Sequence, residues 1–338
     1  MSRARCALAA LGFFLALAAL SGCGGSGPAS GSGGGRAPGA DSATSRPQPK
    51  VLRVRDSRHR LPAPISGEAV VAAGNDLLVI GGLDEGDTST DEVTRLDPLS
   101  GAARPAGTLS QPLHDLAATV APTGVLVFGG GSATTTVEVQ RLVAGGSGEV
   151  VGKLPVPRSD LSAVTVGGAS YVLGGYDGEG RVGAILRTRD GASLDTAGRL
   201  RVPVRYTALV ALDRVVYTFG GEETRGVDAA VIQRFDPATG KTSIVGHLPG
   251  TLAHASAVAV GGRIYILGGR ADGRTSDQIL RFEPGPARTR RVGRLPAPVQ
   301  NAAAGVVGGV GYLVGGLSPS ERPLSSIVAL DLAAPTGG

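Results

Sequence analysis

A Gly-Gly doublet closes an apolar run six times in this chain, and its spacing constrains the fold more than any other feature. The doublets are Gly81-Gly82, Gly129-Gly130, Gly174-Gly175, Gly220-Gly221, Gly268-Gly269 and Gly315-Gly316. They follow one another at intervals of 48, 45, 46, 48 and 47 residues. Periods in this range are typical of propellers and solenoids. We therefore predict a repeat protein in which these twelve glycines are structural.

Each period carries signals for four short strands. An alternating run such as LAATVA is followed by a tight turn and by the apolar run that ends in the doublet. A polar loop then leads to a third strand such as AAVIQRFD, which ends in turn residues such as Asp236-Pro237. A short fourth strand ends in a Leu-Pro element such as Leu248-Pro249. Four antiparallel strands per period make one propeller blade, so we predict an all-β, six-bladed β-propeller.

The two ends of the repeat region complement each other. The last period stops after its third strand, at 326–332. A spare strand at 51–55 leads into Leu61-Pro62-Ala63-Pro64, which matches the Leu295-Pro296-Ala297-Pro298 that follows the fourth strand of the fifth period. We predict that the N-terminal strand completes the last blade, because this closure removes exposed strand edges. The propeller is expected to span residues 51–332, followed by a tail at 333–338.

The doublet, the hydrophobic residue before Asp-Pro in the third strand and the closing Leu-Pro resemble the kelch motif. The resemblance covers roughly residues 51–332 and implies a kelch-type propeller. The chain departs from the kelch pattern because it has no tryptophan. Ala103, Thr242 and Thr289 fall near the fourth-strand tryptophan, and Leu96, Phe235 and Phe282 replace the third-strand tyrosine. Close kinship to animal kelch adaptors therefore does not follow.

The N-terminus has the features of an export signal. Arg3 and Arg5 precede the apolar stretch ALAALGFFLALAAL, which is short for a membrane span. The following Leu20-Ser21-Gly22-Cys23 resembles the bacterial lipobox, which implies cleavage after residue 22 and lipidation of Cys23. An ordinary secretory signal with an incidental cysteine is the alternative. Residues 23–50 are rich in Gly, Ser and Pro and are expected to form a flexible tether. We expect an exported protein, held by its lipid at the extracytoplasmic face of the membrane.

Composition excludes several classes of function. The two cysteines are Cys6 and Cys23, so residues 51–332 cannot form a disulfide, a cysteine zinc site or a catalytic thiol. Copper oxidases of kelch architecture use a tyrosine–cysteine crosslink, which this chain cannot form. Basic residues are scattered along the sequence without interleaved aromatics, so we expect no nucleic-acid partner. We expect a monomer without a cofactor.

One set of positions forms a candidate binding rim. The doublet strand ends, and the first strand begins, on the same face of a propeller, around its central funnel. Counting back fourteen residues from each doublet gives Gly67, Asp115, Asp160, Tyr206, His254 and Asn301. The preceding positions are Ser66, His114, Ser159, Arg205, Ala253 and Gln300. We predict that His114, Asp115, Asp160, Arg205, Tyr206, His254, Gln300 and Asn301 bind a hydrogen-bonding ligand such as a glycan or a peptide. A solvated rim of strand caps is the alternative.

We find no convincing catalytic constellation. His114 and His254 belong to blades two and five, on opposite sides of a six-fold ring, which argues against a metal site. The expected function is a non-catalytic protein- or glycan-binding scaffold in the cell envelope. The alternative is an exported sugar-acting enzyme such as the sialic-acid mutarotases with kelch propellers, for which His114, Asp160, Arg205 and His254 are the candidates.

An arginine recurs in five of the six third strands. The set is Arg95, Arg141, Arg187, Arg234 and Arg281. Because the set is so regular, we predict a structural role in which each arginine pairs with a carboxylate or carbonyl between blades.

Overall fold

The computed structural model describes residues 51–333, which fold almost entirely into β-strands. The predicted signal peptide, Cys23, the tether and residues 334–338 of the predicted tail lie outside the described residues. Within 51–333 the one helix is the 3-10 turn η1 (Thr224–Gly226), and none is long and apolar enough to cross a membrane. The fold is all-β, as predicted.

Six four-stranded sheets, which we number 1 to 6, contain most of the strands in residues 51–333. Sheet 1 is β2 (Ala69–Ala73), β3 (Asp76–Ile80), β4 (Glu92–Leu96) and β5 (Ala103–Thr108). Sheet 2 is β6 (Ala117–Ala121), β7 (Gly124–Phe128), β8 (Glu138–Arg141) and β9 (Glu149–Lys153). Sheet 3 is β10 (Ser162–Val166), β11 (Ala169–Leu173), β12 (Ala184–Thr188) and β13 (Asp195–Arg199).

The second half of the chain repeats this pattern. Sheet 4 is β14 (Ala208–Leu212), β15 (Val215–Phe219), β16 (Val231–Asp236) and β17 (Lys241–His247). Sheet 5 is β19 (Ser256–Val260), β20 (Arg263–Leu267), β23 (Gln278–Glu283) and β24 (Arg288–Arg294). Sheet 6 is β25 (Ala303–Val307), β26 (Val310–Val314), β27 (Ile327–Ala333) and β1 (Val51–Asp56). A small separate sheet joins β18 (Leu252–Ala253), β21 (Arg270–Ala271) and β22 (Arg274–Thr275).

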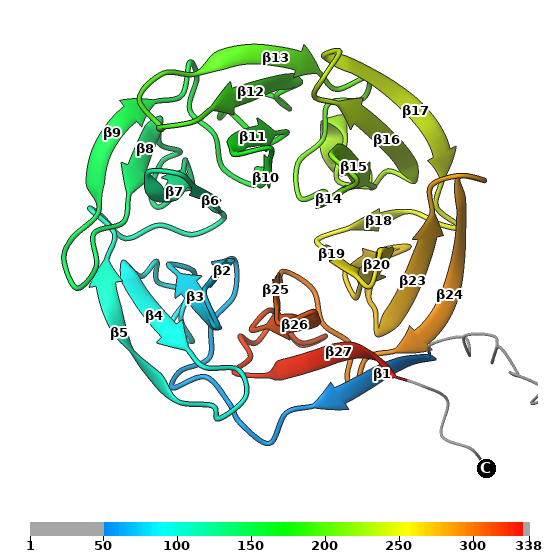
Figure 1. Cartoon of the computed structure of the whole chain (residues 1–338), viewed down its shortest axis with the longest axis horizontal. Coiled ribbons are helices and arrows are strands. Elements are labelled where there is room, and N and C mark those ends of the chain that lie inside the picture. Colours follow the sequence, from blue (N-terminus) through cyan, green and yellow to red (C-terminus); the bar gives the residue numbers. More distant parts are fainter. Residues whose placement is uncertain (1–50, 334–338) are drawn as a thin grey trace, which may run out of the picture. The chain divides into compact units, whose positions relative to one another are not determined.

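The sheets of residues 51–333 lie around a central axis, with the first strand of each innermost (Figure 1). Each first strand lies beside that of the next sheet, and β25 of sheet 6 lies beside β2 of sheet 1. These strands are rich in alanine, as in AVVAA and AATVA, because six of them must fit around one axis. The second strands are almost entirely buried between neighbouring sheets, which explains their continuous apolar runs.

Sheet 6 contains strands from both ends of the described chain. β1 runs antiparallel to β27, from the pair Val51–Ala333 to the pair Asp56–Val328. Leu52 and Val54 point inward and pack on the core between sheets 5 and 6. β1 is one residue longer than the sequence indicated, and β27 has the expected length but begins and ends one residue later.

The doublets join neighbouring sheets. The second glycine donates its N–H to a carbonyl of the next sheet, as in Gly130 to Arg158 O at 2.8 Å and Gly316 to Ile65 O at 2.9 Å. The first glycine has positive φ, and a Cβ on Gly129 would lie 2.2 Å from that same Arg158 oxygen. Only glycine fits this close approach, which is the physical reason for the repeat.

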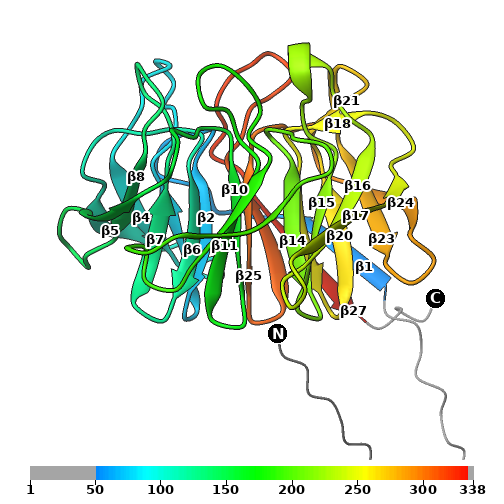
Figure 2. The same ribbon diagram turned by 90° about the horizontal axis from the view of Figure 1, so that it is seen from above.

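The two faces of the ring differ (Figure 2). One face carries the loops that follow the doublets, among them the segment with η1 and β21. The other carries the tight turns between first and second strands. Because Ile327 pairs with Val314 beside the doublet and Ala333 pairs with Val51, the described chain begins and ends at the turn face.

Candidate functional site

The six positions that lie fourteen residues before each doublet meet around the mouth of a central channel, on the loop face. They are Gly67, Asp115, Asp160, Tyr206, His254 and Asn301. The backbone N–H of each donates to the carbonyl oxygen of the preceding position over 2.7–3.2 Å, and the N–H of Gly67 donates to Asn301 O. Six hydrogen bonds therefore form a closed ring. Counting residues in the sequence placed these positions correctly.

All six residues of this ring have left-handed backbone conformations, with φ between 50° and 63°. Glycine adopts this conformation freely, and aspartate, asparagine and histidine are the other residues most often found in it, so five of the six residues have a conformational explanation. Tyr206 does not. A non-glycine residue held in this region costs about 1–3 kcal/mol and is concentrated at functional sites. Tyr206, whose ring stacks on His254, is therefore the strongest sign of function in the ring.

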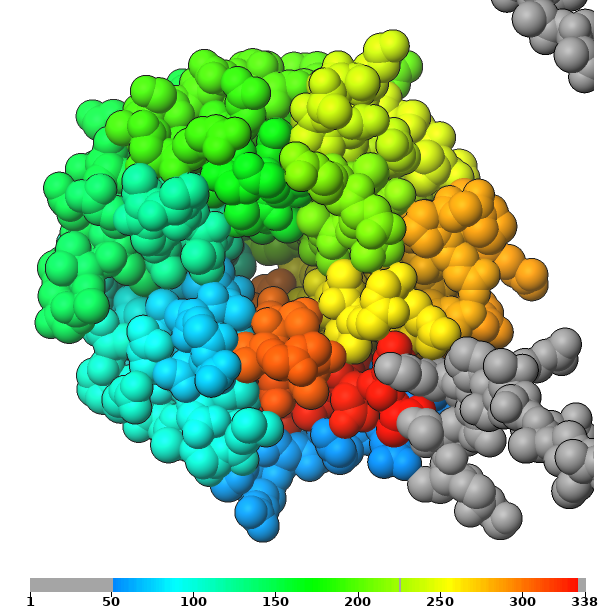
Figure 3. Space-filling model, viewed as in Figure 1, coloured from blue at the N-terminus to red at the C-terminus, as the bar shows by residue number. Residues whose placement is uncertain are grey.

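The channel is narrow, and Figure 3, which views the ring from the turn face, shows it opening at the centre. Its volume is about 180 Å³. Below the ring it is lined by small side chains of the first strands, such as Ala118, Ser162 and Ala257. Pockets for drug-sized ligands have volumes of roughly 300–1,000 Å³. A ligand larger than a small group must therefore lie over the mouth.

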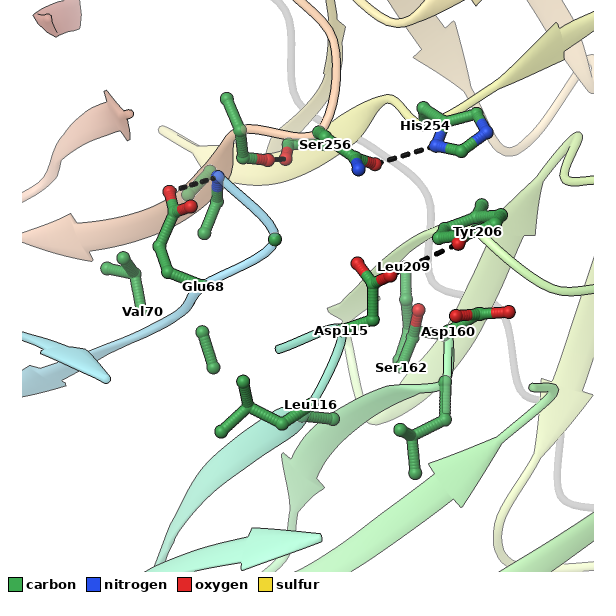
Figure 4. A pocket seen from close by; sticks show the side chains of 18 of the residues that line it. Glu68, Val70, Asp115, Leu116, Asp160, Ser162, Tyr206, Leu209, His254 and Ser256 are labelled. Atoms are coloured by element: carbon green, nitrogen blue, oxygen red, sulfur yellow. Dashed lines mark hydrogen bonds between the residues drawn. The ribbon is translucent and has the colours of Figure 1, made fainter. Parts of the chain in front are cut away.

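Five planar side chains form a continuous stack from the mouth towards the rim. The rings of Tyr206 and His254 stack with centroids 3.9 Å apart (Figure 4). The guanidinium carbon of Arg205 lies 5.0 Å from the Tyr206 ring centre and 5.3 Å from that of Tyr176. Arg181 lies 5.3 Å from the same Tyr176 ring. Cation–π contacts of this kind fix the orientation of each member.

Three arginines converge on one buried carboxylate at the outer end of the stack. Glu222 accepts hydrogen bonds from Arg181, from Arg205 Nε at 2.8 Å and from Arg270 Nη2 at 3.3 Å. Burial would raise the pKa of Glu222, but the hydrogen bond and charge of Arg205 outweigh it and hold this pKa below its usual range. Glu222 is therefore an anion that holds three cations in place.

Two further carboxylates complete this network. Arg205 Nη1 donates to Asp160 at 3.0 Å, and Arg270 donates to Asp228 at 2.6 and 2.9 Å. Burial would lower the pKa of Arg205, but Glu222 and Asp160 more than compensate and raise it. Three cations and three anions balance, so the network is rigid and close to neutral.

Two other carboxyl groups near the mouth differ from Asp160. Tyr206 donates its hydroxyl to Asp115 at 3.1 Å, and burial together with the negative charge of Asp160 raises the pKa of Asp115. Glu68 is 6% exposed and accepts the N–H of Ala303 at 3.2 Å (Figure 4). Burial raises the pKa of Glu68 to about 8. The mouth therefore combines a Glu68 that is mostly protonated at neutral pH with an Asp160 that is paired with Arg205.

The histidines do not meet. His114 Nδ1 bonds Ser89 Oγ at 2.8 Å, whereas His254 Nδ1 bonds Asn301 Oδ1 at 2.6 Å. Burial lowers the pKa of both histidines, so both are neutral at pH 7. Within residues 51–333 no group of three His, Cys, Asp or Glu side chains is placed to hold a metal ion.

The main chains of His114, Arg205 and Gln300 pair with the residue directly after a doublet. The residue after the doublet is Glu222 in sheet 4, Tyr176 in sheet 3 and Arg270 in sheet 5. Sequence reasoning did not assign Tyr176, Glu222 or Arg270 to the site, and it also missed Arg181 and Glu68. The position after the doublet was a usable signal, since it faces the predicted rim in every repeat.

The recurring third-strand arginines pair within their own sheets, which corrects the prediction of contacts between blades. The pairs are Arg95–Asp76, Arg141–Glu149, Arg187–Asp195, Arg234–Asp236 and Arg281–Glu283. Each arginine pairs with a carboxylate on its own strand or on the adjacent strand of the same sheet. These pairs are partly exposed, so each adds little to stability.

Comparisons with known proteins agree with this architecture. The family model described as the kelch motif matches residues 251–285. A solved structure titled "Structure of YjhT" superposes with a TM-score of 0.69 at 12% identity, over 81% of this chain and 99% of that one. No curated protein matches the sequence. The fold is a kelch-type β-propeller.

Proposed function

We propose that this chain is a cell-envelope lipoprotein, anchored through Cys23, whose propeller binds a polar ligand at the channel mouth without transforming it. The propeller has six blades, and the pairing of β1 with β27 closes the last one. Its ligand is a glycan or an extracytoplasmic peptide. The described chain begins at the turn face, opposite the channel mouth.

The stack of Tyr206 and His254 carries this proposal. Both residues have left-handed backbone conformations, and both side chains are held by specific contacts that point them at the mouth. Tyrosine and arginine are the residues that contribute most to binding surfaces, because they offer large contact areas together with hydrogen bonds. The narrow channel favours an extended ligand lying across the mouth, with one small group entering it.

One observation favours a sugar-acting enzyme as the second candidate. Asp115 and Asp160 are neighbours in the ring, yet only Asp160 is paired with an arginine. Two neighbouring carboxyl groups in different electrostatic environments are the usual arrangement for acid–base catalysis. In that case Asp115→Asn, which keeps an acceptor for the Tyr206 hydroxyl, abolishes turnover of a bound sugar while binding persists.

Ligand binding is tested with the mature chain, residues 23–338 carrying Cys23→Ser, on a glycan array and a peptide library. For any ligand found, we expect Arg205→Gln to weaken binding by tenfold or more, because it breaks the stack and two ion pairs. Arg104→Gln, an exposed arginine on sheet 1, is the matched control.

The four histidines supply a second readout without mutation. On ligand addition, we expect the imidazole NMR signals of His114 and His254 to shift while those of His59 and His247 stay constant. Unchanged affinity in Arg205→Gln together with unmoved His114 and His254 signals would place the ligand elsewhere and refute the proposed site.

The anchor is tested separately. Cys23→Ala should move the protein from the membrane fraction to the soluble fraction of the envelope, because the acyl chains have no other attachment point. Metabolic labelling with a fatty acid should mark the wild-type chain and not the variant. Labelling of both chains, or equal membrane retention of both, contradicts anchoring through Cys23.

A further inference from the structure

Two arginine-rich segments that are distant in the sequence lie side by side on the outer rim of the propeller. β1 and the residues after it contain Arg53, Arg55, Arg58 and Arg60, and β24 contains Arg288, Arg290, Arg291 and Arg294. The two strands meet where sheets 5 and 6 adjoin (Figure 1). All eight arginines are exposed, and we call this surface the basic wall.

Strand alternation turns the charges outward. Leu52, Val54 and Val292 pack on the core between sheets 5 and 6. The arginines that alternate with them therefore face solvent. Each segment alone is only a short run of arginines. The single basic surface forms because the fold brings β1 and β24 together.

The wall concentrates charge that the rest of the domain lacks. Residues 51–338 hold 28 Lys and Arg against 27 Asp and Glu, a net charge of +1. Residues 51–60 and 288–294 together hold eight Arg against Asp56, a net charge of +7. The remainder of residues 51–338 therefore has a net charge of −6, so the positive charge of the domain is concentrated in these two segments.

Local carboxylates neutralise only part of the wall. Asp277 pairs with both Arg291 and Arg294. The other pairs are Asp56 with Arg60, Glu283 with Arg290, and Asp331 with Arg55. Among the described residues Arg53 and Arg58 have no ion-pair partner, and Arg288 lies opposite Glu283 without forming a close ion pair with it. The pairs are exposed and easily exchanged for other anions.

We propose that the basic wall docks on the anionic phospholipid surface of the membrane that holds the protein. This inference rests on the anchoring through Cys23 that is part of the proposed function. Arg53 stands thirty residues after Cys23, and a tether of this composition spans on the order of 30 Å. The tether thus keeps the wall at a high effective concentration near the lipid headgroups, where weak contacts suffice.

The chemistry of the wall favours lipid over nucleic acid. Neither segment contains a Phe, Tyr or Trp on which bases could stack. Arginines spread over a convex rim match a diffuse layer of headgroup phosphates. Each arginine near such a surface raises the membrane partition coefficient of the protein about fivefold. Docking through the rim sets the propeller on edge and leaves the channel mouth open to the side.

The test is cosedimentation of the mature chain, residues 23–338 with Cys23→Ser, with phosphatidylglycerol–phosphatidylcholine vesicles. Because no lipid is attached and no ligand is present, failure here is distinct from failure of the ligand-binding proposal. We expect binding to the anionic vesicles, none to pure phosphatidylcholine, and loss of binding at about 1 M salt, where charges are screened beyond about 3 Å.

Matched triple variants locate the contact. Arg53→Gln/Arg58→Gln/Arg288→Gln should lower the partition coefficient by roughly a hundredfold. Arg104→Gln/Arg189→Gln/Arg201→Gln removes equal charge from other exposed positions and should change it less than tenfold. Melting curves confirm that both variants are folded, and the three single wall variants should each show a smaller loss. No binding to anionic vesicles, equal binding to neutral ones or equal losses in both triple variants overturns the proposal, even if the wall binds another polyanion.

Discussion

Deleting residues 51–60 should lower the melting temperature by about 10 °C or more. The deletion removes the six residue pairs between β1 and β27 and the packing of Leu52 and Val54. Net contributions of about 1 kcal/mol per hydrogen bond and per half-buried aliphatic side chain give a loss of about 5 kcal/mol. For a domain of this size each kcal/mol corresponds to about 2–4 °C. Thermal unfolding followed by circular dichroism measures the effect.

The control deletes ten residues of the tether, 31–40, and should leave the melting temperature unchanged. Adding the peptide VLRVRDSRHR to the truncated protein should restore stability in proportion to peptide concentration, because the exposed edge of β27 accepts a strand. A scrambled peptide of the same charge should not. An unchanged melting curve after deletion would show that β1 is dispensable and that the ring holds without it.

The architecture could be predicted because glycine is required at specific points of it. The doublets recur where a Cβ would meet a carbonyl of the next sheet, as at Gly129 and Gly220. This requirement for glycine does not depend on the side chains elsewhere in the blade. The repeat therefore remains recognisable although the kelch tryptophans are absent. Leu96, Phe235 and Phe282 fill the expected third-strand core positions and are almost fully buried.

The site could be predicted only in part. Counting from the doublets located the ring, since those positions belong to the repeat. Tyr176 and Arg181 lie in a loop of sheet 3, and their contact with Arg205 depends on the conformation of that loop. The sequence also could not separate residues that suit the left-handed backbone, such as Asn301, from a residue that does not, such as Tyr206.

Glu68 illustrates a further limit. It lies one position after the ring residue Gly67, where the other repeats have Leu116, Leu161, Thr207, Ala255 and Ala302. Its carboxyl group is buried between sheets 1 and 6, against the backbone of Ala303 and the glycine Gly315. A single charged residue in an otherwise uncharged column gave no repeat signal, and its burial was evident only from the fold.

Glu68→Gln should stabilise the protein at pH 8 and have little effect at pH 5. The pKa of Glu68 is raised to about 8 by burial, against 4.5 for an exposed glutamate. Between these values the folded state holds a proton that the unfolded state has released. Wild-type stability therefore falls as pH rises from about 5 to 8, with a slope of up to about 1.4 kcal/mol per pH unit. The glutamine has no proton to lose and keeps an acceptor for the Ala303 N–H.

Melting curves of wild type and Glu68→Gln at pH 5, 6.5 and 8 measure the effect. We expect the difference to grow with pH and to reach about 3 kcal/mol at pH 8, somewhat below the full value for a raised pKa of this size. Glu85→Gln, the same change at an exposed loop position, should shift the curve by a constant small amount. Asp115 adds to the wild-type slope in the same direction, so some pH dependence remains in Glu68→Gln. Parallel pH profiles for wild type and Glu68→Gln would mean that Glu68 is already ionised in the fold, and the channel mouth would then carry one more negative charge than described above.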